Sequence, residues 1–447
     1  MSTLSREPFT VGTGREAGGG RLAILSMHTS PLAQAGAGDG GGMNVYVREL
    51  ASSLARTGVE CEVFTRAESP DQAAAVSVEP GFTLHNVAAG PLAPVAKESL
   101  VDHVDEWTQA VGAELRAMEA NDMPASAIHT NYWLSGLAGH TLKHELEVPL
   151  LVTFHTLDRV KSDSALGGST FGEPAMRSAA EAQLVGCADA LLASCRVEAD
   201  QLVDLYGAER SRIVSVPPGV QHAYFGPGNR AQARRAVGLD PDAPVILFVG
   251  RIQPLKGPSM AAEVLVELHR SRRDSLDRNS PARNSPAPTL VIVGGPSGPD
   301  GNREMARVQS IISAEGLSDF VRILDPQPHE MLSTYYRAAD VCLVPSYSES
   351  FGMVALEAAA CATPVVAAAV GGLTTVVVDG ETGFLVSDRS AKGFAGPVAR
   401  LLGSPEYAAR IGRRATSCAK AYTWSRAAGR MWERVESLTG SELVACG

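Results

Sequence analysis

The chain has 447 residues, 45% of them hydrophobic, which exceeds the length at which a single hydrophobic core keeps growing, so we expect two domains. Its formal net charge of -10, without a concentrated basic stripe, argues against a nucleic-acid binder. No apolar run approaches the roughly 18 residues of a membrane span, and the N-terminus lacks the apolar stretch of a signal peptide, so we expect no membrane span and a cytoplasmic protein.

The first half of the chain alternates short apolar runs with amphipathic stretches. Residues 1–20 mix Ser, Thr, Arg and Gly without periodicity and are predicted to be a disordered leader. Strands are predicted at 22–27, 61–65, 127–129, 149–154 and 213–216, and helices at 43–56 and 101–119. This alternation is typical of a parallel sheet with crossover helices, and it predicts a Rossmann-like domain over residues 21–217.

A breaker cluster at Pro217, Pro218 and Gly219 marks the predicted domain boundary. A second alternating series follows, with strands predicted at 245–249, 290–293, 321–324, 341–344, 364–368 and 383–386. The fold class is therefore predicted to be α/β, with a second Rossmann-like domain over residues 218–423.

Two segments stand apart from this alternation. Residues 270–288 are polar, contain prolines and are nearly repetitive, so they are predicted to be a surface loop insertion. Residues 424–447 contain an amphipathic helix at 424–438, which is predicted to pack back against one of the domains.

The seven cysteines are odd in number, scattered along the chain and contain no C-x-x-C pair. This pattern argues against a zinc site and against a disulfide framework. We therefore predict reduced thiols, as in cytosolic proteins.

A glycine-rich loop lies between the first predicted strand and the helix at Met43. Residues 36–41 match G-x-G-x-x-G, the pattern of a dinucleotide site. Eight residues separate the strand from the first glycine, however, and the second strand ends in Thr65 and Arg66 without the acid that binds ribose. The loop is better interpreted as closing over a phosphate-bearing ligand at a helix start; the alternative is a surface turn.

Two cations follow the buried strand at 245–249. Arg251 and Lys256 lie five positions apart in a loop at the carboxyl edge of the sheet, where α/β proteins bind ligands. Two cations at one point suit a diphosphate leaving group, because they neutralise its growing charge. The alternative is a pair of solvated surface charges.

Two carboxylates, Glu349 and Glu357, lie on either side of a helix start predicted near Phe351 and Gly352. Such carboxylates can accept hydrogen bonds from sugar and ribose hydroxyls while the free helix N–H groups face a phosphate. The alternative for Glu349 is a dipole partner of the helix, worth well under about 1 kcal/mol.

The E-x7-E element at Glu349, the GRIQPLKG loop at 250–257, the GGPSG turn at 294–298 and the glycine-rich loop together resemble retaining family 4 glycosyltransferases. The resemblance extends from Arg21 over nearly the whole chain and implies the GT-B architecture, in which two Rossmann-like domains face a central cleft. The segments SMHTSPL, GGMNVY, YWLSG and SYSESFG look like the branch of this family that acts on an inositol phosphate. The resemblance implies transfer of N-acetylglucosamine from UDP-GlcNAc to 1D-myo-inositol 3-phosphate, the first step of mycothiol biosynthesis, by a homodimer.

The same resemblance implies which residues form the site. The implied catalytic residues are His155, Arg251, Lys256 and Glu349. The implied acceptor residues are His28, Asp39, Gly40, Gly41, Gly42, Met43, Asn44, Lys97, Tyr132, Thr156 and Arg177, with Lys97, Tyr132, Thr156 and Arg177 as the phosphate cradle. The implied donor residues are Gln34, Gly42, Arg251, Lys256, Gln327, Glu349, Ser350, Phe351, Gly352 and Glu357. No cofactor is implied for the chemistry, but a peripheral, structural Mg²⁺ is implied near Tyr336, Arg337, Ala339 and Thr363.

Two departures from the family pattern concern Asn131, where relatives often carry His, and Gln327, in a loop that sometimes supplies an Arg to the nucleotide. Retention without an obvious carboxylate nucleophile near His155 favours a front-face route over double displacement. Three alternatives remain: another family 4 transferase resembling sucrose-phosphate synthase, an NAD-dependent oxidoreductase, and a nucleotide-sugar-binding protein without turnover.

Overall fold

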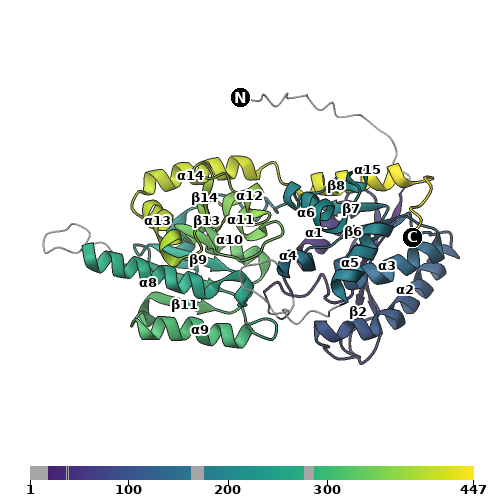
Figure 1. Ribbon diagram of the computed structural model, residues 1–447, viewed down its shortest axis with the longest axis horizontal. Helices are drawn as coiled ribbons and strands as arrows, with labels where there is room; N and C mark the ends of the chain where they lie inside the picture. Colours follow the sequence, from purple (N-terminus) through teal and green to yellow (C-terminus); the bar gives the residue numbers. More distant parts are fainter. Residues whose placement is uncertain (1–18, 37, 39, 163–175, 276–285, 447) are drawn as a thin grey trace, which may run out of the picture.

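The computed structural model describes residues 19–36, 38, 40–162, 176–275 and 286–446. In these residues the chain forms two separate β-sheets, each covered by helices, in two lobes that lie side by side (Figure 1). Nearly all of the predicted leader, the predicted acceptor residue Asp39 and part of the predicted loop insertion lie outside the described residues.

The first sheet has the strand order β3-β4-β2-β1-β5-β6-β7-β8. Its strands are β1 Arg21–Leu25, β2 Glu60–Arg66, β3 Ala75–Glu79, β4 Phe82–Val87, β5 Ala127–Asn131, β6 Leu150–Thr153, β7 Ala190–Ala193 and β8 Ile213–Ser215. All pairs are parallel except β3 with β4, which is antiparallel. The carboxyl ends of the parallel strands therefore meet at one edge of the sheet.

The helices of this domain are α1 Gly42–Ala55, α2 Val104–Glu119, α3 Tyr132–Leu146, α4 Asp158–Ser162, α5 Arg177–Cys187 and α6 Arg196–Tyr206, with 3₁₀ turns at Lys97–His103 and Arg210–Arg212. Helix α2 buries Trp107, Val111 and Leu115, at the spacing of one helical face. That face packs in the core with residues of α3, such as Trp133 and Leu142.

The second sheet has the strand order β11-β10-β9-β12-β13-β14, and all its pairs are parallel. Its strands are β9 Val245–Val249, β10 Thr289–Val293, β11 Val321–Leu324, β12 Val341–Val344, β13 Val365–Ala368 and β14 Gly383–Val386. The sequence VILFV of β9 is apolar throughout because helices cover both faces of this central strand.

The helices of this domain are α7 Arg230–Ala236, α8 Pro258–Ser275, α9 Gly301–Ala314, α10 His329–Ala338, α11 Met353–Ala360, α12 Leu373–Val376, α13 Ala391–Leu402 and α14 Pro405–Ala419, with 3₁₀ turns at Pro254–Lys256 and Ser318–Phe320. Helix α11, rich in Ala, is buried between the sheet and α14. Its N-terminus lies at the carboxyl edge of the sheet, where Gly352 and Met353 line a cavity.

Helix α15, Trp424–Leu438, returns to the first domain and packs against α1, as Figure 1 shows in yellow. Its buried residues, among them Trp424 and Met431, join the core that includes Tyr46 and β1. The outgoing chain at Gly219 passes so close that a Cβ there would lie 2.2 Å from the backbone N of Trp424. The two crossings between the domains therefore run side by side, and only glycine fits at this approach.

One predicted element needs correction, and some elements were not predicted, among them the β3–β4 hairpin and β7. Helix α8 continues to Ser275, so residues 270–275 of the predicted loop are helical; ion pairs of Arg270 and Arg273 with Glu315 of the neighbouring segment support this last turn. The β3–β4 hairpin was missed, although Pro80 and Gly81 supply its turn. Strand β7 was also missed, because its four apolar residues directly follow a helix.

The prediction of seven reduced cysteines is wrong for two of them. Cys187 and Cys446 form a disulfide, although 259 residues separate them in the sequence. Sequence spacing could not show this pair, because only folding brings the chain end to α5. The other five cysteines are free, four of them buried and Cys418 exposed.

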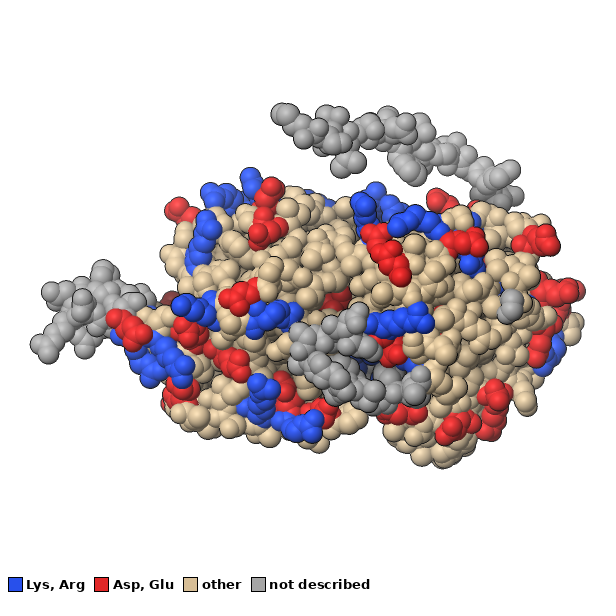
Figure 2. Space-filling view, in the orientation of Figure 1, with Lys and Arg blue, Asp and Glu red and all other residues tan. Residues whose placement is uncertain are grey.

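On the face drawn in Figure 2, the charged side chains of the described residues mix both signs over both lobes. This distribution agrees with the absence of a basic stripe in the sequence. Among the described helices, none combines the length and apolar character that crossing a bilayer requires.

Candidate active site

A cavity of about 570 Å³ lies between the two sheets, and both domains line it. The first domain contributes residues that follow β1, β5, β6 and β7, such as His28, Tyr132, His155 and Ser194. The second domain contributes the segments after β9, β10 and β12. The carboxyl edges of both sheets thus face each other across the cavity, which confirms the predicted GT-B arrangement with a central cleft.

Most residues that the resemblance implied line this cavity. They are His28, Gly41, Gly42, Met43, Lys97, Tyr132, His155, Thr156, Arg251, Lys256, Glu349, Ser350, Phe351 and Gly352. The implied residues that are described but do not line it are Gln34, Gly40, Asn44, Arg177, Gln327 and Glu357.

The predicted phosphate cradle is one connected group around the ring of Tyr132. Arg177, fully buried at the start of α5, donates to the hydroxyls of Tyr132 and Thr156, each at 3.0 Å. Its guanidinium lies 4.8 Å from the Tyr132 ring centroid, and the Lys97 Nζ lies 5.8 Å from the same centroid. Glu181 accepts from Arg177 Nε at 2.7 Å, so the arginine is held from behind. This geometry fixes the direction of two cations and two hydroxyls.

His155 lies just past β6, with a left-handed φ of 61°. Burial lowers the pKa of its imidazole to about 3, so the ring is neutral at pH 7. Its Nε2 lies 2.8 Å from Asn131 Oδ1, an atom that only accepts, so Nε2 carries the proton and Nδ1 is an acceptor. The departure at Asn131 thus contacts the candidate catalytic histidine and sets its tautomer.

The backbone around His155 links the two domains. Ser350 of the second domain donates its hydroxyl to the His155 carbonyl oxygen.

Tyr132, like His155, has a left-handed φ, of 75°. Non-glycine residues adopt such angles at a cost of about 1–3 kcal/mol, and they gather at functional sites.

The glycine-rich loop ends at Gly41, the N-cap of α1. Asn44 is buried and stabilises this loop: its Oδ1 accepts from Gly41 N at 3.0 Å, and its Nδ2 donates to Thr29 Oγ1 at 2.7 Å. A Cβ on Gly41 would lie 3.4 Å from Arg251 Nε, so the loop of one domain contacts the cation of the other. The N-terminus of α1 and the side chain of Arg251 therefore face the same region, which suits an anion.

Gln34 and Gln327 lie near Pro326, outside the lining of the cavity. Gln34 Nε2 donates to the Pro326 carbonyl oxygen at 2.7 Å, across the domain boundary. Gln327 Nε2 donates to the Asp325 carbonyl oxygen at 2.9 Å. Both amides are engaged with the protein backbone.

On the donor side, Lys256 and Glu349 form an ion pair, with Nζ 2.6 Å from Oε2. Their side chains are 25% and 18% exposed, and both line the cavity. A bound diphosphate would offer Lys256 a second anionic partner, so this pair is a place where ligand and protein compete.

Glu357 is buried one turn into α11, away from the cavity lining. Its carboxylate accepts from Tyr336 Oη at 2.8 Å and contacts His329 Nε2 at 2.7 Å. Burial lowers the pKa of His329, but the charge and hydrogen bond of Glu357, together with the charges of Glu49 and Glu330, outweigh burial and raise that pKa above its ordinary value. A carboxylate can accept about four hydrogen bonds, so the predicted contact of Glu357 with ribose stays a prediction.

Comparison with known proteins decides the family. Residues 229–417 match the model of glycosyl transferases group 1, and residues 41–219 match the glycosyl transferase 4-like domain. The chain is 46% identical over 409 residues to D-inositol 3-phosphate glycosyltransferase of Acidothermus cellulolyticus, covering 90% of this chain and 87% of that protein. It is 45% identical over 408 residues to the protein of the same name from Actinosynnema mirum, covering 91% and 94%. The chain belongs to the D-inositol 3-phosphate glycosyltransferase family.

Solved structures agree with this glycosyltransferase assignment. Sucrose-phosphate synthase from Thermosynechococcus elongatus has a TM-score of 0.84 at 30% identity, covering 95% of this chain and 100% of that one. WaaG, a glycosyltransferase involved in lipopolysaccharide biosynthesis, has a TM-score of 0.67 at 18% identity, covering 94% and 100%, and shows the fold alone.

Sequence reasoning missed several residues that line the cavity of this glycosyltransferase, above all Glu198 on α6, and also Lys161 and Arg303. Glu198 Oε2 accepts from Ser194 N at 2.8 Å and also from the Ser194 hydroxyl. Burial raises the pKa of Glu198 although these hydrogen bonds oppose it. The segment SCRVEAD, which follows β7, gave no recognisable signal because β7 itself was missed.

The residues implied for Mg²⁺ gather where α10 ends. Thr363 Oγ1 donates to the Tyr336 carbonyl oxygen at 2.6 Å, and Arg337 donates to the carbonyl oxygens of Gly226 and Tyr224. The set therefore offers uncharged carbonyl and hydroxyl oxygens, which are hard ligands suited to Mg²⁺. Helix α10 also directs its negative end toward this point.

Proposed function

We propose that this glycosyltransferase transfers N-acetylglucosamine from UDP-GlcNAc to 1D-myo-inositol 3-phosphate, with retention, as the first step of mycothiol biosynthesis. The observation that carries the proposal is the group of Lys97, Tyr132 and Thr156, which line the first-domain side of the cavity, with Arg177 buried directly behind them. A phosphate monoester needs cations and hydroxyl donors at one point, and this acidic chain gathers them there. The names of its relatives support the same acceptor.

The proposed reaction is a front-face transfer. The bond from the anomeric carbon to the diphosphate oxygen breaks while the acceptor oxygen bonds to the same face of that carbon. The proton of the acceptor hydroxyl passes to the departing diphosphate. Arg251, Lys256 and the N–H groups of α1 stabilise the charge that grows on it.

His155 has a positioning role in this proposal. Its neutral ring, with the proton on Nε2, can accept a hydrogen bond from a substrate hydroxyl at Nδ1. Glu198 is a poor candidate for a nucleophile, because burial favours its protonated form. Both points support the front-face route over double displacement.

Mass analysis of the product tests the proposal. The enzyme is incubated with UDP-GlcNAc and inositol 3-phosphate, and in parallel with unphosphorylated inositol and with fructose 6-phosphate. We expect a product mass that contains the N-acetylhexosamine and the inositol phosphate, and an anomeric proton coupling in its NMR spectrum that shows the α-configuration of the donor retained. Transfer to fructose 6-phosphate instead would favour a role like that of the sucrose-phosphate synthase it resembles at 30% identity, and absence of turnover would favour a nucleotide-sugar-binding protein.

The proposal includes a peripheral Mg²⁺ with a structural role. Backbone carbonyl oxygens at the end of α10 and the Thr363 hydroxyl would hold it. Mg²⁺ should then raise the Tm of the wild type and not that of Thr363→Val, and kcat should be the same with and without a chelator. A kcat that depends on Mg²⁺ would contradict this role.

A further inference from the structure

The chain after α15 returns to the first domain and is anchored there by a buried ion pair. Lys143 of α3 and Asp189 approach to 2.9 Å, with side chains 0% and 2% exposed. Lys143 Nζ donates to the Val444 carbonyl oxygen at 2.9 Å, and Val444 N donates to Asp189 Oδ1 at 2.7 Å. These contacts fix the backbone two residues before Cys446, so the position of its sulfur is determined by the fold.

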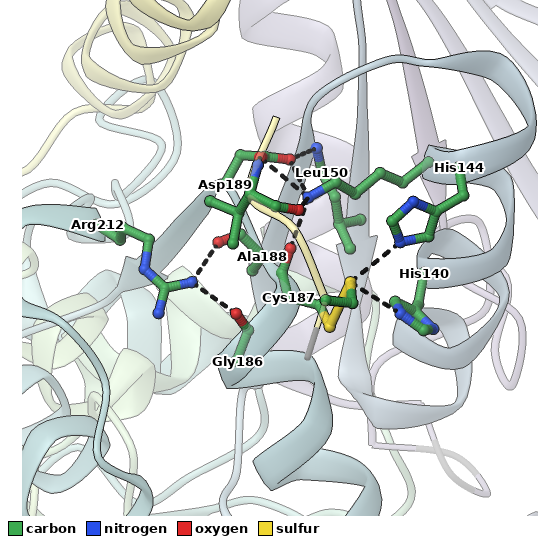
Figure 3. The surroundings of a disulfide bond; sticks show 11 residues. His140, His144, Leu150, Gly186, Cys187, Ala188, Asp189 and Arg212 are labelled. Atoms are coloured by element: carbon green, nitrogen blue, oxygen red, sulfur yellow. Dashed lines mark hydrogen bonds and ion pairs between the residues drawn. A yellow bond between two sulfur atoms is a disulfide. The ribbon is translucent and has the colours of Figure 1, made fainter. Parts of the chain in front are cut away.

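The nitrogen and sulfur ligand atoms of His140, Cys187 and Cys446 meet at this position, and His144 contacts the sulfur of Cys446. His140 and His144 lie one turn apart on α3, and Cys187 is the last residue of α5. The Nε2 atoms of His140 and His144 lie 3.2 Å and 3.0 Å from Cys446 Sγ. The ligand atoms of His140, Cys187 and Cys446 all lie within 4.8 Å of one another. Figure 3 shows both imidazoles turned toward the sulfurs from the same side of α3.

Two thiolates and two imidazoles are a preferred ligand set of Zn²⁺, which binds four such atoms tetrahedrally. The sequence hid this set because its members come from two helices and a distant tail, without the short Cys spacing of zinc motifs. The two sulfurs cannot be zinc ligands and a disulfide at once. Whichever state holds, the tail is tied to the ends of α3 and α5.

We propose that His140, His144, Cys187 and Cys446 form a redox-gated zinc site. In the reduced protein the two thiolates and two imidazoles bind Zn²⁺. Oxidation by a low-molecular-weight disulfide removes two electrons from the thiolates, releases Zn²⁺ and forms the Cys187–Cys446 bond. The S–S bond of the small disulfide breaks as it takes up the two electrons, and it leaves as two thiolates that take protons from water, so atoms and charge balance.

The site is separate from the candidate active site. Tyr132 and Arg177 are the first residues of α3 and α5, whereas the four ligands lie at the later turns of α3, the end of α5 and the tail. At 1.5 Å per residue, the ten steps along α5 place Cys187 about 15 Å from Arg177. The proposed Zn²⁺ is therefore structural, and its ligands can be changed without removing groups from the cavity.

Zinc titration of the full chain tests the proposal. The protein is stripped of metal, reduced with a phosphine that does not chelate, and titrated with Zn²⁺ against a chromophoric chelator. We expect one Zn²⁺ per reduced chain and none after oxidation with a small disulfide. Cys446→Ser and His140→Ala should each weaken binding by about 10-fold or more. Cys418→Ser, which removes an exposed free thiol, is the matched control and should bind as the wild type does.

Cobalt gives a second readout that does not depend on affinity. The reduced wild type with Co²⁺ should show a thiolate-to-cobalt charge-transfer band and the visible bands of a tetrahedral ion. Saturated Cys446→Ser should show that band at about half the intensity, because only the Cys187 thiolate remains. Circular dichroism checks that each variant is folded. A folded, reduced wild type that binds no Zn²⁺, or equal binding by Cys446→Ser and wild type, would overturn the proposal.

Discussion

Arg177, behind the acceptor side of the cavity, is fully buried and held by Tyr132, Thr156 and Glu181. Lys256, on the donor side, is 25% exposed and forms an ion pair with Glu349. The acceptor group is thus built before any ligand arrives. The donor pair has to exchange a protein carboxylate for a diphosphate. The two sides differ in how much of their geometry the fold already fixes, and this difference predicts different kinetic consequences of mutation.

The largest effect is expected at Lys256. Lys256→Ala removes a cation whose interaction with the diphosphate is strongest when the glycosidic bond breaks, so kcat should fall about 100-fold or more. The acceptor KM should change little. Steady-state kinetics with both substrates varied measures this, and Lys420→Ala, an exposed lysine far along the chain, is the control. A kcat close to that of the wild type would contradict the role of Lys256 in stabilising the departing diphosphate.

A smaller, acceptor-specific effect is expected at Tyr132. Tyr132→Phe keeps the ring beside Lys97 and Arg177 but removes the hydroxyl that accepts from Arg177. The proton of this hydroxyl is the proposed donor to the acceptor phosphate, and loss of one such hydrogen bond costs about 0.5–1.5 kcal/mol, so the acceptor KM should rise several-fold while the donor KM stays the same. Equal changes in both KM values would indicate a general distortion instead of a prebuilt acceptor group.

The pH profile sharpens the comparison at His155. Asn131→Asp places a carboxylate at Nε2, which favours the imidazolium and raises the low pKa of His155 toward its ordinary value of about 6.5. The protonated ring has no acceptor at Nδ1, so kcat of the variant should fall as the pH drops through this raised pKa. The wild-type kcat should show no such step between pH 5 and 8. A variant profile that matches the wild type would contradict the assigned tautomer.

The smallest effect concerns stability of the acceptor domain. Burial lowers the pKa of His129 and of His155 to about 3. The unfolded chain therefore binds protons below about pH 6.5 that the folded state does not, and stability declines as the pH falls from there toward about 3. The Tm should drop between pH 7.5 and pH 5. In His129→Gln this drop should be smaller, and an unchanged slope would count against a buried neutral His129.

Much of the architecture was readable from the sequence, because buried parallel strands are continuous apolar runs. The predicted strand at 245–249 coincides with β9, and the cations that follow it line the cavity as the strand-end position indicated. The acceptor group was found through a family resemblance, since nothing in the spacing of Lys97, Tyr132, Thr156 and Arg177 shows that they meet.

Contacts between residues far apart in sequence could not be predicted. Asn131 was noted only as a departure from the family, and its contact with His155 depends on β5 and β6 being neighbours. Glu357 stays a predicted donor residue, and its contacts with Tyr336 and His329 depend on α10 and α11 packing together. Cys187 and Cys446 meet only because the chain returns after α15.

We infer that a prebuilt group on the acceptor side binds the phosphate of the acceptor and so selects it. The most direct test is the ratio of kcat/KM for inositol 3-phosphate to that for unphosphorylated inositol, measured in the wild type and in Lys97→Ala. Lys97 lines the cavity beside Tyr132, and a hydrogen bond to a charged group is worth about 1.5–3 kcal/mol. We expect this ratio of kcat/KM values to be large in the wild type and to fall by about 10-fold or more in Lys97→Ala, with the donor KM unchanged. The same ratio in both proteins, or a ratio near one in the wild type, would contradict it.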